Sequence, residues 1–127
     1  MHLTVLALTG VLMGSLTTFV GLPLLTESLA WLGAYVLWVT YGLRFKMETP
    51  IRTMAVASTL SGLLASSIQV LFMEAYKQNN AGWYAHRFLG ESQTVAIQFF
   101  GQGIGGGLIL GLICGLVTAQ IAKRRAA

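Results

Sequence analysis

Four long stretches of the chain contain no charged side chain, and short polar segments separate them. The charge-free stretches are residues 1–26, 28–43, 53–73 and 92–122. A helix needs about 20 mostly apolar residues to cross the ~30 Å hydrocarbon core of a bilayer. The pattern therefore predicts an all-α integral membrane protein with a single domain, 1–127, and four transmembrane helices at about 3–21, 27–43, 53–73 and 97–122.

Proline, glycine and small polar residues mark the ends of the first spans. Gly21 and Pro23 are expected to end the first helix, because proline lacks the backbone N–H that a helix interior needs. Thr26 or Ser28 can then cap the second helix. In the linker 44–52, Pro50 favours an extended or turn conformation before the third span.

The segment 74–92 is the only sizeable polar stretch in the sequence. Residues 79–82, Asn-Asn-Ala-Gly, are typical of a turn. Two interpretations stay open for 83–90. It forms either a short helix at the membrane interface, with Trp83 and Phe88 facing lipid head groups, or an irregular loop held there by Trp83.

Composition agrees with this membrane assignment. Of the 127 residues, 55% are hydrophobic and 9% are charged, whereas soluble domains usually contain about 25% charged residues. These values exclude a soluble fold of this size, a disordered chain, a nucleic-acid-binding domain and a disulfide-stapled secreted module. The single cysteine, Cys114, excludes an intrachain disulfide and any mechanism that needs a cysteine pair.

Basic residues are divided unevenly between the two sides that four spans define. The side with both termini and the 44–52 linker holds Arg44, Lys46, Arg52, Lys123, Arg124 and Arg125, whereas the other side holds Lys77 and Arg87. Since cytoplasmic loops are rich in Lys and Arg, both termini are expected in the cytoplasm, with the protein in a bacterial plasma (inner) membrane. The first span has no basic residue before it and exceeds the usual 7–15 apolar residues of a signal peptide, so we expect it to be retained.

Small residues recur every four positions in the fourth span, at Gly103, Gly107, Gly111, Gly115 and Ala119. This spacing gives a helix a flat face on which another backbone can pack closely. The first span offers Gly10 and Gly14 at the same spacing, and the third span offers Gly62. The glycine ladder therefore predicts either packing inside the chain or a seam between copies of it, and the two are equally favoured.

The segment 101–107 contains five glycines in seven residues. Its letters match the GxGxxG fingerprint, but a dinucleotide site also needs a preceding strand, which a membrane span does not supply. Local unwinding of the helix around a substrate is the functional alternative, as in transporters with broken helices. Close helix packing is the favoured interpretation.

A group of polar side chains falls in the outer half of the predicted bundle. At a rise of about 1.5 Å per residue, the group contains Thr17, Thr18, Gln69 and Gln102, with Glu27 and Glu74 at the outer rim. These residues fit two interpretations. One is a polar cavity that opens to the outside. The other, slightly favoured, is that they hold the helices together, with hydroxyls bonding their own backbone and glutamines bonding each other.

Aromatic residues share one face of the second span. They are Trp31, Tyr35, Trp38 and Tyr41, at spacings of four, three and three. Trp31 and Tyr41 fit the aromatic belts at the two membrane interfaces. The deeper pair, Tyr35 and Trp38, fits either a packed or lipid-facing stripe or a site for a lipid, quinone or cation.

Catalytic and metal-binding chemistry has little basis in the sequence. His2 and His86 are predicted on opposite sides of the membrane, so they cannot share a metal ion or a haem. No span contains a His or Lys that could activate a serine or threonine as a nucleophile. We therefore expect no metal, no cofactor, no enzymatic activity and no nucleic-acid partner.

Two functions compete on these observations. The first is a self-associating channel or transporter-like protein with a polar cavity in its outer half. The second is a non-catalytic accessory or assembly subunit that docks its glycine face onto a larger membrane complex. The expected partners are membrane lipids together with either further copies of the chain or that larger complex.

Overall fold

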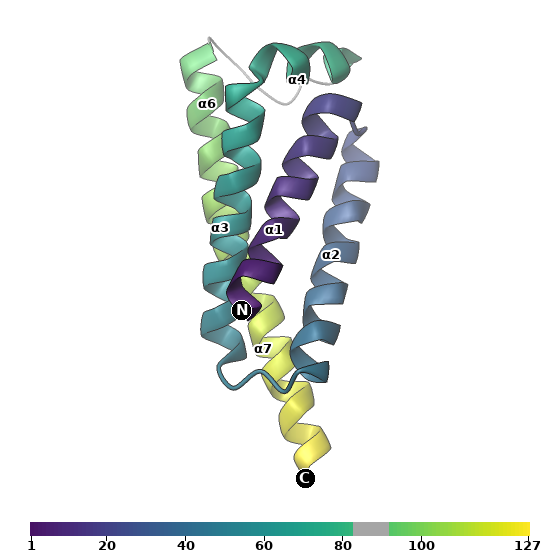
Figure 1. Ribbon diagram of the computed structural model, residues 1–127, viewed down its shortest axis with the longest axis vertical. Helices are drawn as coiled ribbons and strands as arrows, with labels where there is room; N and C mark the ends of the chain where they lie inside the picture. The colour runs from purple at the N-terminus through teal and green to yellow at the C-terminus, as the bar shows by residue number, and fades with distance from the viewer. Residues whose placement is uncertain (83–91) are drawn as a thin grey trace.

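The computed structural model describes residues 1–82 and 92–127, and these residues form helices and no strand (Figure 1). These residues also include two π-helical segments: η1 continues α1, and η2 lies between α6 and α7. The elements are α1 His2–Ser15, η1 Leu16–Val20, α2 Leu24–Arg44, α3 Pro50–Leu71, α4 Met73–Asn79, α6 Ser92–Gly101, η2 Gln102–Gly106 and α7 Gly107–Ala126. The proposed interfacial helix at 83–90 lies outside the described residues.

Among the described residues, three helices are long and apolar enough to cross a membrane. They are His2–Val20, Pro50–Leu71 and Thr94–Ala126. The second predicted span, at 27–43, corresponds to α2, which has 21 residues but does not join this group by hydropathy. Glu27 and the tryptophan and tyrosine residues of α2 make it less apolar than the other three helices.

Proline residues set two of the helix starts, and both differ from the predicted bounds. Pro23 is the residue before α2, so the helix begins at Leu24 without a side-chain cap. The predicted capping role of Thr26 or Ser28 is therefore wrong, and the Ser28 hydroxyl instead donates to the carbonyl oxygen of Leu24 at 2.8 Å. Pro50 occupies the first turn of α3, where its missing N–H costs nothing.

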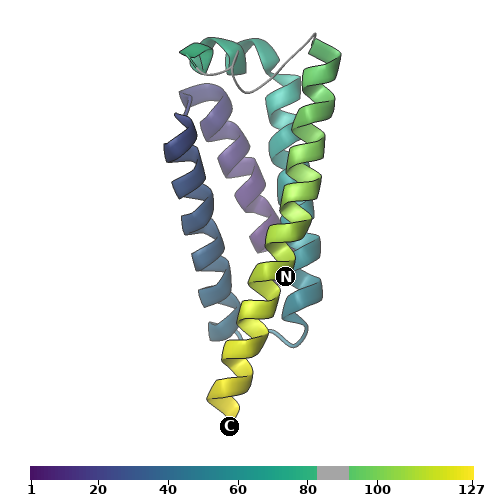
Figure 2. The same cartoon turned by 180° about the vertical axis from the view of Figure 1, so that it is seen from behind.

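A short helix, α4, occupies part of the polar segment where only a turn was predicted. It packs against η1 and lies across one end of the longer helices (Figures 1 and 2). Tyr76 of α4 is fully buried and meets Phe99 of α6 edge-on, with ring centroids 4.9 Å apart. Asn80, which ends the helix, donates to the carbonyl oxygens of Thr17 and Tyr76, both at 2.8 Å.

The glycine-rich segment 101–107 remains helical. Figure 2 shows α6, η2 and α7 as one long helix, and the residues around Gly101, Gly106 and Gly107 keep right-handed helical dihedral angles. The unwound alternative for 101–107 is therefore wrong. The widening is limited to the π-helical segment η2, since a π-helix adds one residue to the hydrogen-bonded turn.

Helix α3 is the centre of the packing, because both α1 and α7 lie against it. At the contact between α1 and α3, glycines of α1 lie against the backbone of α3. A Cβ atom on Gly14 of α1 would lie 2.8 Å from the Ala65 Cα, and one on Gly10 would collide with the Ser61 carbonyl group. Such close approach leaves no room for a side chain at either glycine.

Glycines of η2 and α7 approach α3 in the same way. A Cβ atom on Gly107 would lie 2.5 Å from the Ser58 carbonyl oxygen, and one on Gly111 would lie 2.5 Å from that of Met54. Gly103 lies against Gly62, and Gly115 lies against Ile51. The structure thus places the ladder glycines, which lie in η2 and α7, against α3 of the same chain.

Candidate functional site

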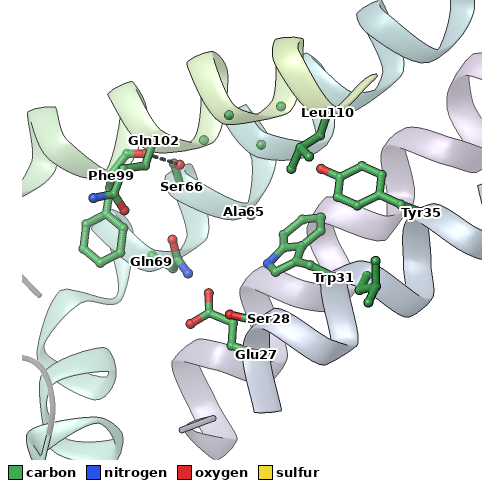
Figure 3. Close-up of a pocket in the computed structure, with 15 residues that line it drawn as sticks. Glu27, Ser28, Trp31, Tyr35, Ala65, Ser66, Gln69, Phe99, Gln102 and Leu110 are labelled. Carbon is green, nitrogen blue, oxygen red and sulfur yellow. Dashed lines mark hydrogen bonds between the residues drawn. The ribbon is translucent and has the colours of Figure 1, made fainter. Parts of the chain in front are cut away.

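A cavity of about 400 Å³ lies between α2, α3 and the continuous helix α6–η2–α7 (Figure 3). The second helix meets the bundle near its C-terminal end, where Gly42 lies against Met54 and Thr118. From there α2 and α6 diverge towards the end of the molecule that carries α4 (Figure 2). The cavity occupies the space between the diverging helices.

One face of α2 forms the first wall. Glu27, Trp31 and Tyr35 recur at four-residue intervals, which places them about 40° apart around the helix. The Trp31 and Tyr35 rings are stacked at 6.0 Å with an interplanar angle of 26°. The Tyr35 hydroxyl group lies 3.2 Å from the Ser58 hydroxyl group of α3, which ties the inner part of this wall to the neighbouring helix.

The second wall is the C-terminal half of α3, where the Ser66 and Gln69 side chains are hydrogen-bonded. The Ser66 hydroxyl donates to the carbonyl oxygen of Phe99 at 2.8 Å. The amide nitrogen of Gln69 donates to the Thr17 hydroxyl at 2.9 Å. These bonds fix α3 against α6 and against η1, so this wall is held in place from two sides.

The third wall is the long helix, and glycine forms much of it. Gly103 and Gly107 lie between the cavity and α3, so a side chain at either would run into α3. Gly106 also lines the cavity, but outside its own stretch of helix no described atom lies within 4 Å of the position of a Cβ atom there. Gly106 therefore faces the open space of the cavity, with Gln102 and Leu110 one turn away on either side.

The residues predicted for a polar cavity separate into two groups. Glu27, Gln69 and Gln102 line the cavity. Thr17 and Thr18 are buried at 1% and 0% exposure and do not line it, and the Thr17 hydroxyl donates to the carbonyl oxygen of Met13. The interpretation in which polar side chains hold the helices together fits Thr17, because its hydroxyl accepts a hydrogen bond from Gln69 of α3.

Glu74, the sixth residue of that predicted set, lies on α4 away from the cavity. Its carboxylate is 3.4 Å from the Lys77 ammonium group, and 83% of its side chain is exposed. Like Glu27, it belongs to the end of the molecule that carries α4, but only Glu27 lines the cavity (Figure 3).

The aromatic face of α2 also divides. Trp31 and Tyr35 line the cavity, whereas Trp38 and Tyr41 turn towards α1. Trp38 is 3% exposed and donates from its indole nitrogen to the Thr9 hydroxyl at 3.0 Å. The Tyr41 hydroxyl lies 2.9 Å from a ring nitrogen of His2. Part of the predicted ligand face and part of the predicted polar group thus line one cavity. The sequence analysis had treated the two as separate sites.

Sequence reasoning missed several residues that line the cavity. They are Ser28, Leu32, Ala65, Phe99, Gly106 and Leu110. The spacing of Ser28 and Leu32 from Trp31 could have placed them on the same side of α2. For Gly106, which differs from its neighbours by facing open space, no signal in the sequence was available.

The side chains that line this cavity are of several chemical kinds. They combine one carboxylate, two amides and hydroxyl groups with three aromatic side chains. Across the described ranges 1–82 and 92–127, no group of three or more His, Cys, Asp and Glu residues could hold a metal ion. No family model, curated protein or solved structure matches this chain. Function therefore has to be inferred from the cavity itself.

Proposed function

We propose that the protein is a transporter-like membrane protein with four spans, whose outer-half cavity binds a small molecule. The observation that carries this proposal is the cavity itself. It gathers polar and aromatic side chains from α2, α3 and the long helix α6–η2–α7. Ligand sites in helical membrane proteins commonly lie between helices, and this volume is within the range of about 300–1,000 Å³ that small-molecule sites occupy.

In this proposal α2 crosses the membrane together with the three more apolar helices. Its 21 residues extend for about 32 Å, which is enough to cross the hydrocarbon core. It runs beside α1 after a turn at 21–23, and the linker 45–49 returns the chain to α3 at the opposite end (Figure 1). The excess of Lys and Arg supports a cytoplasmic location for that linker and for both termini.

This orientation places the cavity in the outer half of the membrane. Glu27 is in the first turn of α2, and Gln69 is in the last turn of α3. Both turns lie at the end of the molecule that carries α4, away from the 45–49 linker (Figure 1). A small molecule would therefore enter from the outside or from the outer leaflet.

The accessory-subunit alternative depended on a free glycine face. Gly103, Gly107, Gly111 and Gly115 contact α3 within the chain, so that face is covered. Self-association through the same face is disfavoured for the same reason. A homo-oligomer of this protein would need another surface, and the cavity does not depend on one.

We expect single cysteines to report the four-span topology. In a Cys114→Ala background, Gln78→Cys should react with a membrane-impermeant thiol reagent from outside, whereas Lys46→Cys should react only after the membrane is opened. Gln78 is the better outer site because it is exposed, while the neighbouring Asn80 is 2% exposed and hydrogen-bonded. Labelling of both cysteines from the same side would contradict the four-span arrangement.

The cavity can be tested with cysteines on adjacent residues. Gly106→Cys, which faces the cavity, should react with small membrane-impermeant thiol reagents added outside, at a rate about tenfold or more above that of Gly105→Cys. Gly105 has equally open surroundings but does not line the cavity. Water-soluble reagents do not reach a thiol in hydrocarbon. Equal rates for the two folded variants would contradict a cavity that opens outwards, and with it the transporter-like function.

A further inference from the structure

Basic side chains gather at the end of the molecule opposite α4 (Figure 1). They come from the end of α2, the linker, the first turn of α3 and the last turn of α7, and they are Arg44, Lys46, Arg52, Lys123, Arg124 and Arg125. All six are exposed, and Glu48 is the only acid among the described residues of this end. The ion pair that the described residues form joins Glu74 and Lys77 at the opposite end. The basic end therefore carries an excess of positive charge that no carboxylate neutralises by contact.

A groove of about 490 Å³ lies at the same end, between the start of α3 and α7. Ile51 and Ala55 line it from α3, and Leu112 and Ala119 line it from α7. The two helices are in contact at Gly115 and Ile51, so both walls belong to one packed unit. Each wall is part of a helix that is long and apolar enough to cross a membrane. Lipid chains can therefore reach the groove.

Positive charge lies at the end of this groove that is nearer to the chain terminus. Arg52 lines the groove itself. Lys123 follows Ala119 by four residues, which turns α7 by only about 40°, so Lys123 continues the α7 wall past the groove. Glu48 also lines the groove, but it forms no ion pair with Arg52 among the described residues. With six bases against one acid, the local field favours an anion.

The groove changes from charged to apolar along the helix axis. Leu112 precedes Lys123 by 11 residues, which is about 16 Å of helix. A phospholipid in the leaflet at this end has the same order, since its phosphate lies at the surface and its acyl chains lie inside. An arginine guanidinium group matches the geometry of phosphate oxygens, and basic pockets between membrane helices suit anionic lipid head groups.

We infer that this groove is a binding site for an anionic phospholipid, with the phosphate held by Arg52 and Lys123 and one acyl chain along Ile51 and Leu112. The site is separate from the cavity between α2 and α3, and it requires only that α3 and the long helix cross the membrane. Positive charge that served orientation alone would act equally from any of the six bases. A built site instead depends on Arg52 and on the open space of the groove.

Native mass spectrometry of the full-length protein, released from micelles with added phosphatidylglycerol or phosphatidylcholine of identical chains, tests the head group. We expect one phosphatidylglycerol to bind about tenfold more tightly than phosphatidylcholine. Arg52→Gln should weaken phosphatidylglycerol binding about tenfold, whereas Arg44→Gln should change it by less than about twofold. Arg44 is the matched control, because it is also exposed but does not line the groove.

Two leucine variants test the acyl chain. Ala119→Leu should weaken phosphatidylglycerol binding because its larger side chain occupies the groove. Ala122→Leu, the same change at an exposed position of α7 that does not line the groove, should bind as the parent does. Glycerol phosphate, which has the phosphate but no chains, should not compete even in large excess. The thermal unfolding temperature of each variant reports whether it is folded.

Three results would overturn the inference. Equal affinity for phosphatidylglycerol and phosphatidylcholine would exclude recognition of the anionic head group. Equal losses in Arg52→Gln and Arg44→Gln would mean that the charge of the whole end, and not the groove, attracts the lipid. Parent-like binding by folded Ala119→Leu would place the acyl chain elsewhere. Arg52→Gln alters an exposed side chain, so it remains a test if Ala119→Leu does not fold.

Discussion

Gly111→Leu should destabilise the protein strongly, whereas Gly105→Leu, the same substitution six residues earlier, should be tolerated. A Cβ atom on Gly111 would lie 2.5 Å from the Met54 carbonyl oxygen and 2.8 Å from the Ala55 Cα. These are backbone atoms, so α3 and α7 would have to separate to admit a leucine. Overpacking of this kind costs about 1–3 kcal/mol, and displaced backbone favours the upper end of the range. The midpoint of thermal unfolding in one detergent measures the difference.

Gly105 is a close control because no atom lies within 4 Å of a Cβ atom built there. Leucine has a higher helix propensity than glycine, by about 0.5–1 kcal/mol, so Gly105→Leu should unfold at or slightly above the parent temperature. Leu112→Ala, at a 38% exposed position beside the ladder, should have a small effect. If Gly111→Leu unfolds at the parent temperature while Leu112→Ala unfolds earlier, the wrong face of α7 has been assigned to the packing.

The long helices could be predicted from the sequence because their lengths follow from a simple physical constraint. The hydrocarbon core requires about 20 apolar residues, and charge-free stretches of that length are plain in the chain. Helix ends were less accurate because individual residues decide them. Pro23 and Pro50 moved two helix starts by three residues each, to Leu24 and Pro50. Proline at or just before the first turn fixes a helix start in a way that the hydropathy pattern does not record.

Helix α4 could not be predicted because tertiary contacts stabilise it. Seven residues are too few for a hydrophobic period to be recognised, and a helix this short is unstable alone. In the structure, the Tyr76 ring packs on Phe99, and the Asn80 side-chain amide donates to the carbonyl oxygen of Thr17 in η1. Both partners are distant in the sequence, so only the folded chain supplies them.

The position of each polar side chain along its helix follows from the sequence, but its direction around that helix was not predictable. Thr17 and Gln69 face each other between η1 and α3, whereas Gln102 faces the cavity. Depth depends on position along one helix, and direction depends on how neighbouring helices rotate to pack their glycines. The aromatic face of α2 shows the same limit. Tyr35 and Tyr41 are six residues apart and so point about 120° apart, one to the cavity and one to His2.

Gly21→Ala should also destabilise the protein, by about 2 kcal/mol or more, through two separate effects. Gly21 has a φ of 77°, a backbone conformation that residues with a Cβ atom rarely adopt. A Cβ atom there would also lie 2.9 Å from the carbonyl carbon of Asn79 and would collide with its oxygen. Asn79 is held in that position, since its side-chain amide donates to the carbonyl oxygens of Thr18 and Phe19 at 2.9 and 3.2 Å. The α4 end of the molecule would therefore have to shift.

Gly33→Ala is the matched control for this change, because it adds the same methyl group to a glycine inside α2 that has no atom within 4 Å of its Cβ position. Alanine is favoured over glycine in a helix by about 0.8–1.0 kcal/mol, so Gly33→Ala should raise the temperature of thermal unfolding while Gly21→Ala lowers it. Cysteine labelling at Gln78 provides a second measurement, since displacement of α4 should change its reaction rate in Gly21→Ala and leave it unchanged in Gly33→Ala. Equal unfolding temperatures for the two alanine variants would mean that the turn after η1 relaxes freely, and that α4 is not held against it.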